Sequence, residues 1–145
     1  MKSLSCFIAA GAICAVLTAI AGDTPSSRRS SDPRIEHGKY LVHQAGMCID
    51  CHSPRDEKGG LIESKLLTGA PIGFKPTVPM PWVPVAPGLA GLPTGYGDAE
   101  MVRFLMTGTR PNGTTTLPPM PPYRFNRKDA EAITAYLRSL PSASR

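Results

Sequence analysis

Apolar residues recur at helical spacing in a stretch that begins at Asp32 and ends at Gly46. Asp32 is a good helix cap, and Pro33 suits the first helical position because an N–H would have no partner there. Gly46 is placed to end the helix. The apolar face consists of Ile35, Gly38, Leu41, Val42 and Ala45. This pattern predicts a first helix, in which Gly38 is either a point of close helix crossing or a tolerated glycine.

Two further stretches have the same spacing in the second half of the chain. One runs from Asp98, a potential cap, to a stop at Gly108. The other runs from the Asn126 cap, with Asp129 three residues on, to Pro141. Their apolar positions are Met101, Val102, Leu105 and Met106 in the one, and Ala130, Ile133, Tyr136, Leu137 and Leu140 in the other. The sequence therefore predicts three main helices.

Long loops separate these helices. Of the 16 prolines, seven lie in residues 71–93 and five in residues 111–122, which excludes long helices and central strands there. No sustained alternation of apolar and polar residues occurs between Pro54 and Gly97. The predicted fold is all-α with long Pro-rich loops, and such loops need something large and apolar to pack against.

The first 21 residues have a different character. A lysine precedes a run of mainly apolar residues that ends in Ala19-Ile20-Ala21, a pattern that suits signal peptidase. We expect residues 1–21 to be a secretory signal peptide, with an uncleaved membrane anchor as the alternative. Residues 22–31 are expected to be a flexible leader and residues 32–142 one domain. Export would place the domain in the periplasm, with no stable membrane span after signal cleavage.

Four cysteines occur in the chain, and Cys6 and Cys14 would leave with the signal peptide. The other two, Cys48 and Cys51, are followed directly by His52, which gives the C-x-x-C-H spacing of covalent haem attachment. A redox disulfide would need a strand–helix–strand setting, and zinc would need a second pair of Cys or His ligands. Thioether bonds to haem would consume both thiols in an oxidising compartment. The motif predicts one covalently bound haem c, with His52 as an iron ligand.

The ligand opposite His52 decides whether the iron carries electrons or keeps an open position for chemistry. Met120 is the preferred ligand, because its loop lies between the second and third helices and the flanking prolines restrict the unfolded chain. Met80, also in a Pro-rich loop, and an open or water-bound iron are the alternatives. Less suitable by position are Met47 beside the attachment motif, Met101 and Met106 in the second helix, and His37 and His43 in the first.

Charge changes this picture little. The chain has 16 basic and 11 acidic residues, and loss of Lys2 with the signal peptide leaves a formal charge of +4 before haem propionates are counted. A basic surface of this kind either steers docking to an acidic partner or is simply solvated. No basic run with interleaved aromatic residues occurs, so nucleic-acid binding is not expected.

Four segments carry most of these features: HGKYLVHQAGMCIDCH (37–52), GDAEMVRFLMTGTRPNG (97–113), LPPMPPY (117–123) and DAEAITAYLRSLP (129–141). Together they resemble the class I cytochrome c domains of periplasmic alcohol and related dehydrogenase complexes. The resemblance implies the cytochrome c fold, in which the first and third helices cross beside the haem. It also implies His52 and Met120 as axial ligands, in agreement with the order of ligands along the chain.

Two functions fit these observations. The first is a periplasmic electron carrier that takes single electrons from a dehydrogenase towards the respiratory chain, with a cytochrome or oxidase as acceptor. The chain itself would then not be an enzyme. The second is a haem enzyme or ligand sensor, peroxidase-like, with an exchangeable sixth iron ligand; the prolines around Met120 argue against it. Residues that could contact the haem or its propionates, or could equally be ordinary packing and surface residues, are Trp82, Tyr96, Arg103 and Tyr123.

Overall fold

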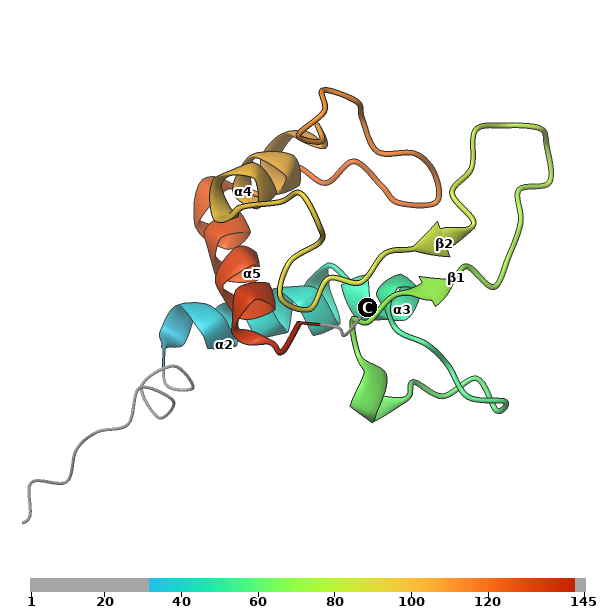
Figure 1. The fold of residues 1–145 in the computed structure, drawn as a ribbon, viewed down its shortest axis with the longest axis horizontal. Coiled ribbons are helices and arrows are strands. Elements are labelled where there is room, and N and C mark those ends of the chain that lie inside the picture. Colours follow the sequence, from blue (N-terminus) through green and yellow to red (C-terminus); the bar gives the residue numbers. More distant parts are fainter. Residues whose placement is uncertain (1–31, 143–145) are drawn as a thin grey trace, which may run out of the picture.

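The computed structural model describes residues 32–142, and Figure 1 shows how they are arranged. The expected signal peptide, residues 1–21, and the expected leader, residues 22–31, lie outside the described residues. The three longer helices pack together on one side of the molecule. Loops and a small two-stranded sheet extend from them on the other side.

The first helix begins where the sequence predicts. α2 (Pro33–Tyr40) is capped by Asp32, whose side chain accepts a hydrogen bond from the backbone N–H of Arg34 at 2.9 Å. The helix then continues as η1 (Leu41–Ala45), a five-residue π-helix, and ends at Gly46. The change of helix type was not predicted, because a π-helix has no distinct pattern of apolar residues in so short a stretch.

The C-x-x-C-H motif forms a short helix of its own, α3 (Cys48–His52). Met47, with a φ of 49°, takes the left-handed conformation that turns the chain from the first helix into α3. The backbone N–H of Asp50 donates to the carbonyl oxygen of Met47 at 3.1 Å and closes the first turn. The attachment motif therefore follows the first helix directly, as predicted, but points in a new direction.

The structure confirms the second helix as α4 (Asp98–Thr107). The prediction that Asp98 caps it is wrong, because Gly97 is the cap residue and Asp98 is already helical. The Asp98 carboxylate instead accepts a hydrogen bond from Arg138 at 2.6 Å. The acidic side chain is still favourable in the first turn, where it faces the positive end of the helix dipole.

The third helix, α5 (Arg127–Ser139), crosses the first at Gly38. Asn126 caps α5 as predicted, accepting a hydrogen bond from the backbone N–H of Asp129 at 2.9 Å. A β-carbon on Gly38 would overlap the carbonyl oxygen of Ala132 in α5. The glycine is therefore required by the close approach, and the crossing of first and third helices that the family resemblance implies is confirmed.

A short antiparallel sheet was not predicted. β1 (Ala70–Pro71) pairs with β2 (Val85–Ala86), and two residues are too few to show an alternating pattern. Residues 72–84 between the two strands form a loop that projects from the body of the molecule, called the arm below (Figure 1). A single turn of 3-10 helix, η2 (Glu63–Lys65), precedes the sheet.

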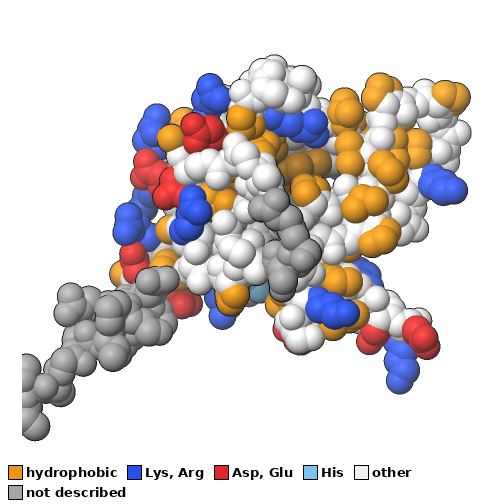
Figure 2. All heavy atoms as spheres, viewed as in Figure 1, with side chains coloured by type: hydrophobic (Ala, Val, Ile, Leu, Met, Phe, Trp, Pro, Cys, Tyr) orange, Lys and Arg blue, Asp and Glu red, His pale blue; other side chains and the backbone are white. Residues whose placement is uncertain are grey.

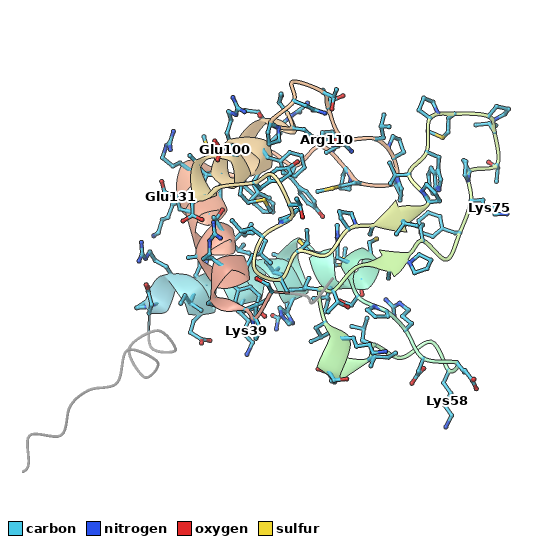
Figure 3. The ribbon with its side chains drawn as sticks, viewed as in Figure 1. Lys39, Lys58, Lys75, Glu100, Arg110 and Glu131 are labelled. Carbon is cyan, nitrogen blue, oxygen red and sulfur yellow. The ribbon has the colours of Figure 1, made fainter. Side chains whose placement is uncertain are left out.

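The hydrophobic core lies where the helices meet, and its fully buried side chains include Val42, Leu67, Ile133 and Leu137. Charged side chains such as Lys39, Glu100 and Glu131 lie on the helices (Figure 3). Apolar side chains gather over the arm (Figure 2), and Lys75 is the one charged residue in residues 66–97. Within residues 32–142, no helix is both long enough and apolar enough to cross a membrane.

Candidate cofactor site

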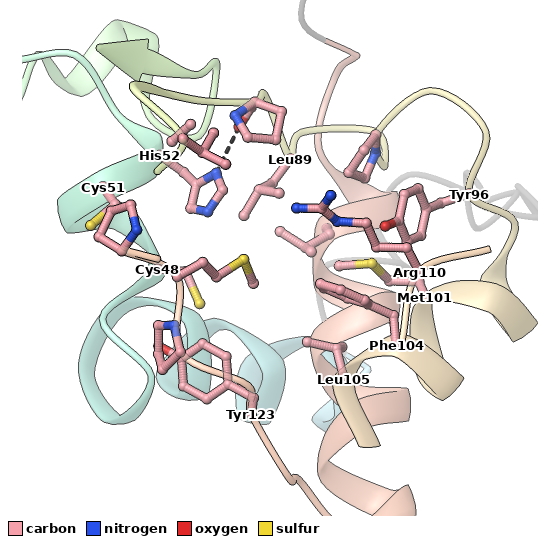
Figure 4. Close-up of a pocket in the computed structure, with 18 of the residues that line it drawn as sticks. Cys48, Cys51, His52, Leu89, Tyr96, Met101, Phe104, Leu105, Arg110 and Tyr123 are labelled. Carbon is pink, nitrogen blue, oxygen red and sulfur yellow. Dashed lines mark hydrogen bonds between the residues drawn. The ribbon is translucent and has the colours of Figure 1, made fainter. Parts of the chain in front are cut away.

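A cavity of about 1030 Å³, including its open mouth, lies between the helices and the loops. Cys48, Cys51, His52 and Met120 all line it, so the structure brings the four predicted site residues together (Figure 4). The rest of the lining is mainly apolar and includes Leu89, Met101, Phe104, Leu105, Ile133 and Leu137. A concave and mainly apolar space of this kind is typical of a cofactor site.

His52 is held in one orientation by a hydrogen bond on its far side. The ring is buried, with 6% of the residue exposed, and its Nδ1–H donates to the carbonyl oxygen of Pro87 at 2.7 Å (Figure 4). A carbonyl can only accept, so Nδ1 carries the proton and Nε2 keeps its lone pair. Burial lowers the pKa of His52, although the bond to Pro87 opposes this. The ring is therefore a neutral imidazole with one free nitrogen, which is the form that binds a metal.

Cys48 and Cys51 are both partly buried at one side of the cavity and are not joined to each other. Burial raises the pKa of the Cys48 thiol to about 11, so it has little thiolate character at neutral pH. A redox-active cysteine pair needs the opposite shift. The described residues 32–142 also bring no three His, Cys, Asp or Glu side chains together as a metal site.

Met120 reaches the cavity from a loop that is tied to three other parts of the chain. The backbone N–H of Val83 donates to Pro118 at 2.9 Å, and the N–H of Phe125 donates to Leu105 at 3.1 Å. The Tyr123 hydroxyl donates to the carbonyl oxygen of Gly46, just before the attachment motif. Met120 itself is half-buried against the core.

The other methionines are placed differently. Met80 lies in the arm, is 44% exposed and faces a separate hollow formed by the arm itself. Met101 lines the cavity but is buried in the core, and Met106 packs against the core without lining the cavity. Met47 lies at the mouth of the cavity beside the cysteines and is 59% exposed.

The two histidines of the first helix pair with α5 and do not line the cavity. His37 Nε2 lies 2.8 Å from the Asp129 carboxylate. His43 Nε2 lies 2.6 Å from the Tyr136 hydroxyl. Both therefore connect the first helix to α5.

Two of the four residues suggested as haem contacts or ordinary packing residues line the cavity. Tyr96 and Tyr123 line the cavity, whereas Trp82 belongs to the arm and Arg103 is exposed on α4. Sequence reasoning missed Arg110, which does line the cavity. A signal for it was present: Arg110 follows the glycine that ends the second helix, at the start of the segment that leads back towards Met120.

The residues of the cavity fit a haem. Two cysteines three residues apart can form its thioether bonds, and the neighbouring imidazole offers a free nitrogen. A thioether from a separate loop lines the same cavity, whose walls are otherwise mainly apolar. Fold and site together define a small helical protein that holds its haem covalently.

Comparison with protein families agrees with this. Residues 35–141 match the family model described as cytochrome c. The chain therefore belongs to the cytochrome c family. Its cofactor is a covalently bound haem c, and its role in this family is to transfer electrons rather than to catalyse a reaction of its own.

Two curated relatives are named as parts of dehydrogenases. A nicotinate dehydrogenase subunit of Pseudomonas putida is 31% identical over 125 residues, which are 80% of this chain and 10% of that protein. The fructose dehydrogenase cytochrome subunit of Gluconobacter japonicus is 30% identical over 114 residues, which are 72% of this chain and 22% of that protein. The chain thus spans only a small part of the length of either relative.

Proposed function

We propose that this chain is a periplasmic electron carrier that takes single electrons from a dehydrogenase partner or complex and passes them towards the respiratory chain. The names of the two relatives support a dehydrogenase as the donor. The signal-like pattern of residues 1–21 supports export. The observation that carries the proposal is the convergence of Cys48, Cys51, His52 and Met120 on one largely apolar cavity.

In this proposal each site residue has a defined task. Cys48 and Cys51 would hold the haem by thioether bonds, and His52 and Met120 would bind its iron. The bound haem supplies the one-electron chemistry of its iron. Pro87 fixes the His52 ring through the bond to Nδ1, so that Nε2 keeps one direction. A soft thioether ligand and an apolar wall both favour the reduced state and raise the reduction potential.

The optical spectrum of the oxidised holoprotein tests this ligand set. Methionine bound to ferric haem gives a weak band at the red edge of the visible spectrum, and we expect it here. We also expect the reduced protein to bind carbon monoxide slowly or not at all, because both axial positions are filled. Absence of the band together with rapid carbon monoxide binding would instead indicate the haem enzyme or ligand sensor.

Export and donor need separate experiments. Expression with the full N-terminus, followed by fractionation and N-terminal sequencing, should give a periplasmic protein that begins at Gly22; an intact N-terminus would indicate a membrane anchor. The donor is tested by purifying the native complex that holds this protein and adding dehydrogenase substrate. Reduction of the haem by substrate supports a dehydrogenase donor, and reduction only by quinol contradicts it.

A further inference from the structure

Large apolar side chains are exposed on the arm, residues 72–84, and at the start of β2 directly after it. Within residues 32–142, seven large apolar residues are exposed, and four of them lie in residues 74–85: Phe74, Val78, Met80 and Val85. Figure 2 shows apolar side chains gathered over this part of the molecule. A contiguous apolar patch on the surface of a protein marks a site of interaction.

The arm carries almost no charge, unlike the other loop that projects on this side of the molecule. Residues 55–65 include six charged residues, with Lys58 near the tip of their loop (Figure 3). Residues 72–85 include one charged residue, Lys75. The core of a protein–protein interface is likewise depleted of charge and enriched in aromatic residues and methionine. In charge, the arm is therefore complementary to an apolar, uncharged surface and not to an acidic one.

The apolar patch reaches the rim of the cofactor cavity. Ile72 lines both the hollow of the arm and the cavity. Val85 and Leu117 line the cavity and are nevertheless 54% and 37% exposed, so they lie at its rim. The backbone N–H of Val83 donates to the carbonyl oxygen of Pro118 at 2.9 Å and so joins the base of the arm to this part of the rim. A protein bound to the arm would thus also cover the rim of the cavity that fits a haem.

Contacts within the arm fix its shape. The rings of Phe74 and Trp82 pack edge to face, with centroids 5.5 Å apart. Four prolines in residues 72–84 restrict the backbone. At the base, the N–H of Ile72 donates to Pro84 at 2.8 Å. A stiff loop loses little conformational freedom on binding, so more of the contact energy remains for affinity.

We propose that the arm is the docking surface for the catalytic subunit of the dehydrogenase, which presents an apolar, uncharged face to it in a lasting complex. This inference rests on the proposed function, which supplies the dehydrogenase, and adds where and by which chemistry that subunit binds. Both relatives are named as subunits of dehydrogenases. Interfaces of permanent complexes are more apolar than those of transient ones, as the arm requires.

Two other occupants fit this surface less well. Segments that lie on a lipid surface combine apolar side chains with several lysines or arginines, whereas the arm has Lys75 alone. A second copy of this chain, bound arm to arm, would cover the rim of both cavities. The dehydrogenase would then have no access to either rim.

The first test places a charge in the middle of the patch. The native host produces tagged wild type, Val78→Lys or Tyr40→Lys as its only source of this chain, and each holoprotein is purified with its partners. Tyr40→Lys is the matched control, because Tyr40 is also an exposed apolar residue but lies on α2, on the helical side of the molecule (Figure 1). The catalytic subunit in each preparation is measured by substrate-dependent reduction of a dye that accepts electrons from it directly.

Val78→Lys should retain at least about tenfold less of the catalytic subunit than the wild type, because the interface would bury an unpaired charge. Tyr40→Lys should retain as much as the wild type. The optical spectrum and midpoint potential should be the same in all three holoproteins, since neither position lines the cofactor cavity. Equal retention of the catalytic subunit by Val78→Lys and the wild type would overturn the proposal.

The second test uses the wild-type complex, so it decides even if Val78→Lys fails to fold. A cross-linker with an amine-reactive end and a photoreactive end is attached to lysines, and the linked peptides are identified by mass spectrometry. Lys75 should be linked to the catalytic subunit, whereas Lys39 and Lys128 on the helices should not. Links from Lys75 only to a second copy of this chain, or only to phospholipid, would contradict the proposal.

Failure of the proposed function gives a different result. If the haem of the wild-type complex were reduced by quinol but by no dehydrogenase substrate, the proposed donor would be wrong. If dehydrogenase substrate reduced the haem equally fast in Val78→Lys and the wild type, the proposed function would stand and the docking surface would be wrong.

Discussion

Two methionines in this chain have nearly the same local sequence and very different surroundings. Met80 and Met120 each lie between prolines, in "PMP". Met120 lines the cavity beside the attachment motif, whereas Met80 is 44% exposed in the arm. Flanking prolines therefore do not decide which methionine reaches the iron, although they make either loop stiffer.

The difference lies in how each loop is attached. The Met120 loop is hydrogen-bonded to the base of the arm, to the end of α4 and, through Tyr123, to Gly46 beside the attachment motif. The arm is held mainly at its base, where β1 pairs with β2 and the N–H of Ile72 donates to Pro84 at 2.8 Å. Hydrogen bonds to residues that are distant in the sequence therefore place Met120 in the cavity.

The largest expected effect comes from replacing one methionine and then the other. Met120→Ala should lower the midpoint potential by roughly 0.2 V, a fraction of the range that axial ligands span, and should remove the red-edge band. Reduced Met120→Ala should also bind carbon monoxide rapidly. Met80→Ala should change neither potential nor spectrum. If Met80→Ala alone produced these changes, the comparison of the two loops would be reversed.

A smaller effect should distinguish the cavity wall from the arm. A substitution in the wall should lower the free energy of unfolding more than a substitution in the arm. Leu137→Ala removes a side chain that is 1% exposed and lines the cavity, so unfolding free energy should fall by about 2–5 kcal/mol. Val78→Ala, at a position 61% exposed in the arm, should change it by less than about 0.5 kcal/mol. Urea unfolding of both holoproteins measures the two values. Equal losses would mean that the arm is part of the cooperative core.

The smallest expected effect concerns one attachment of the Met120 loop. Tyr123→Phe removes the hydroxyl that donates to Gly46 and should lower the free energy of unfolding by about 1 kcal/mol. Tyr40→Phe, at an exposed tyrosine of α2, is the control and should cost little.

Tyr123 also predicts a pH dependence. Burial raises its pKa from 10.0 to about 12, so the fold disfavours the phenolate. The stability that depends on the neutral hydroxyl is full below about pH 10 and is lost as the pH rises through about 12. The free energy of unfolding, measured from pH 9 to 12, should therefore fall less steeply in Tyr123→Phe than in the wild type. Parallel curves would show that ionisation of this tyrosine does not cause the loss of stability at alkaline pH.

Much of the fold could be predicted because its determinants are local. The helices show their apolar spacing, the Asn126 cap uses a neighbour three residues away, and the attachment motif is five consecutive residues. Strands β1 and β2 escaped prediction because each strand has only two residues and is defined by its pairing with residues 14 and 16 positions away. Asp98 was misread because its partner, Arg138, lies on another helix.

The site was likewise predictable where its residues are neighbours in the sequence. Its attachment residues are contiguous, and Met120 was preferred over Met80 from its order in the chain and from the family resemblance, since both methionines have flanking prolines. Arg110 was missed because its position after Gly108, at the start of the segment that leads to Met120, does not by itself show that the side chain lines the cavity. Arg103, seven residues earlier on α4, is exposed. Chemistry that depends on long-range packing therefore needs the structure.

Methionine methyl NMR of the reduced holoprotein tests the central claim, that His52 and Met120 hold the iron between them, most directly. With the methionine methyl groups labelled with carbon-13, one signal should be shifted strongly upfield by the ring current of the haem. We predict that this signal disappears in Met120→Ala and remains in Met80→Ala. A signal that remains in Met120→Ala, or a wild-type spectrum without any shifted methyl group, would contradict the claim.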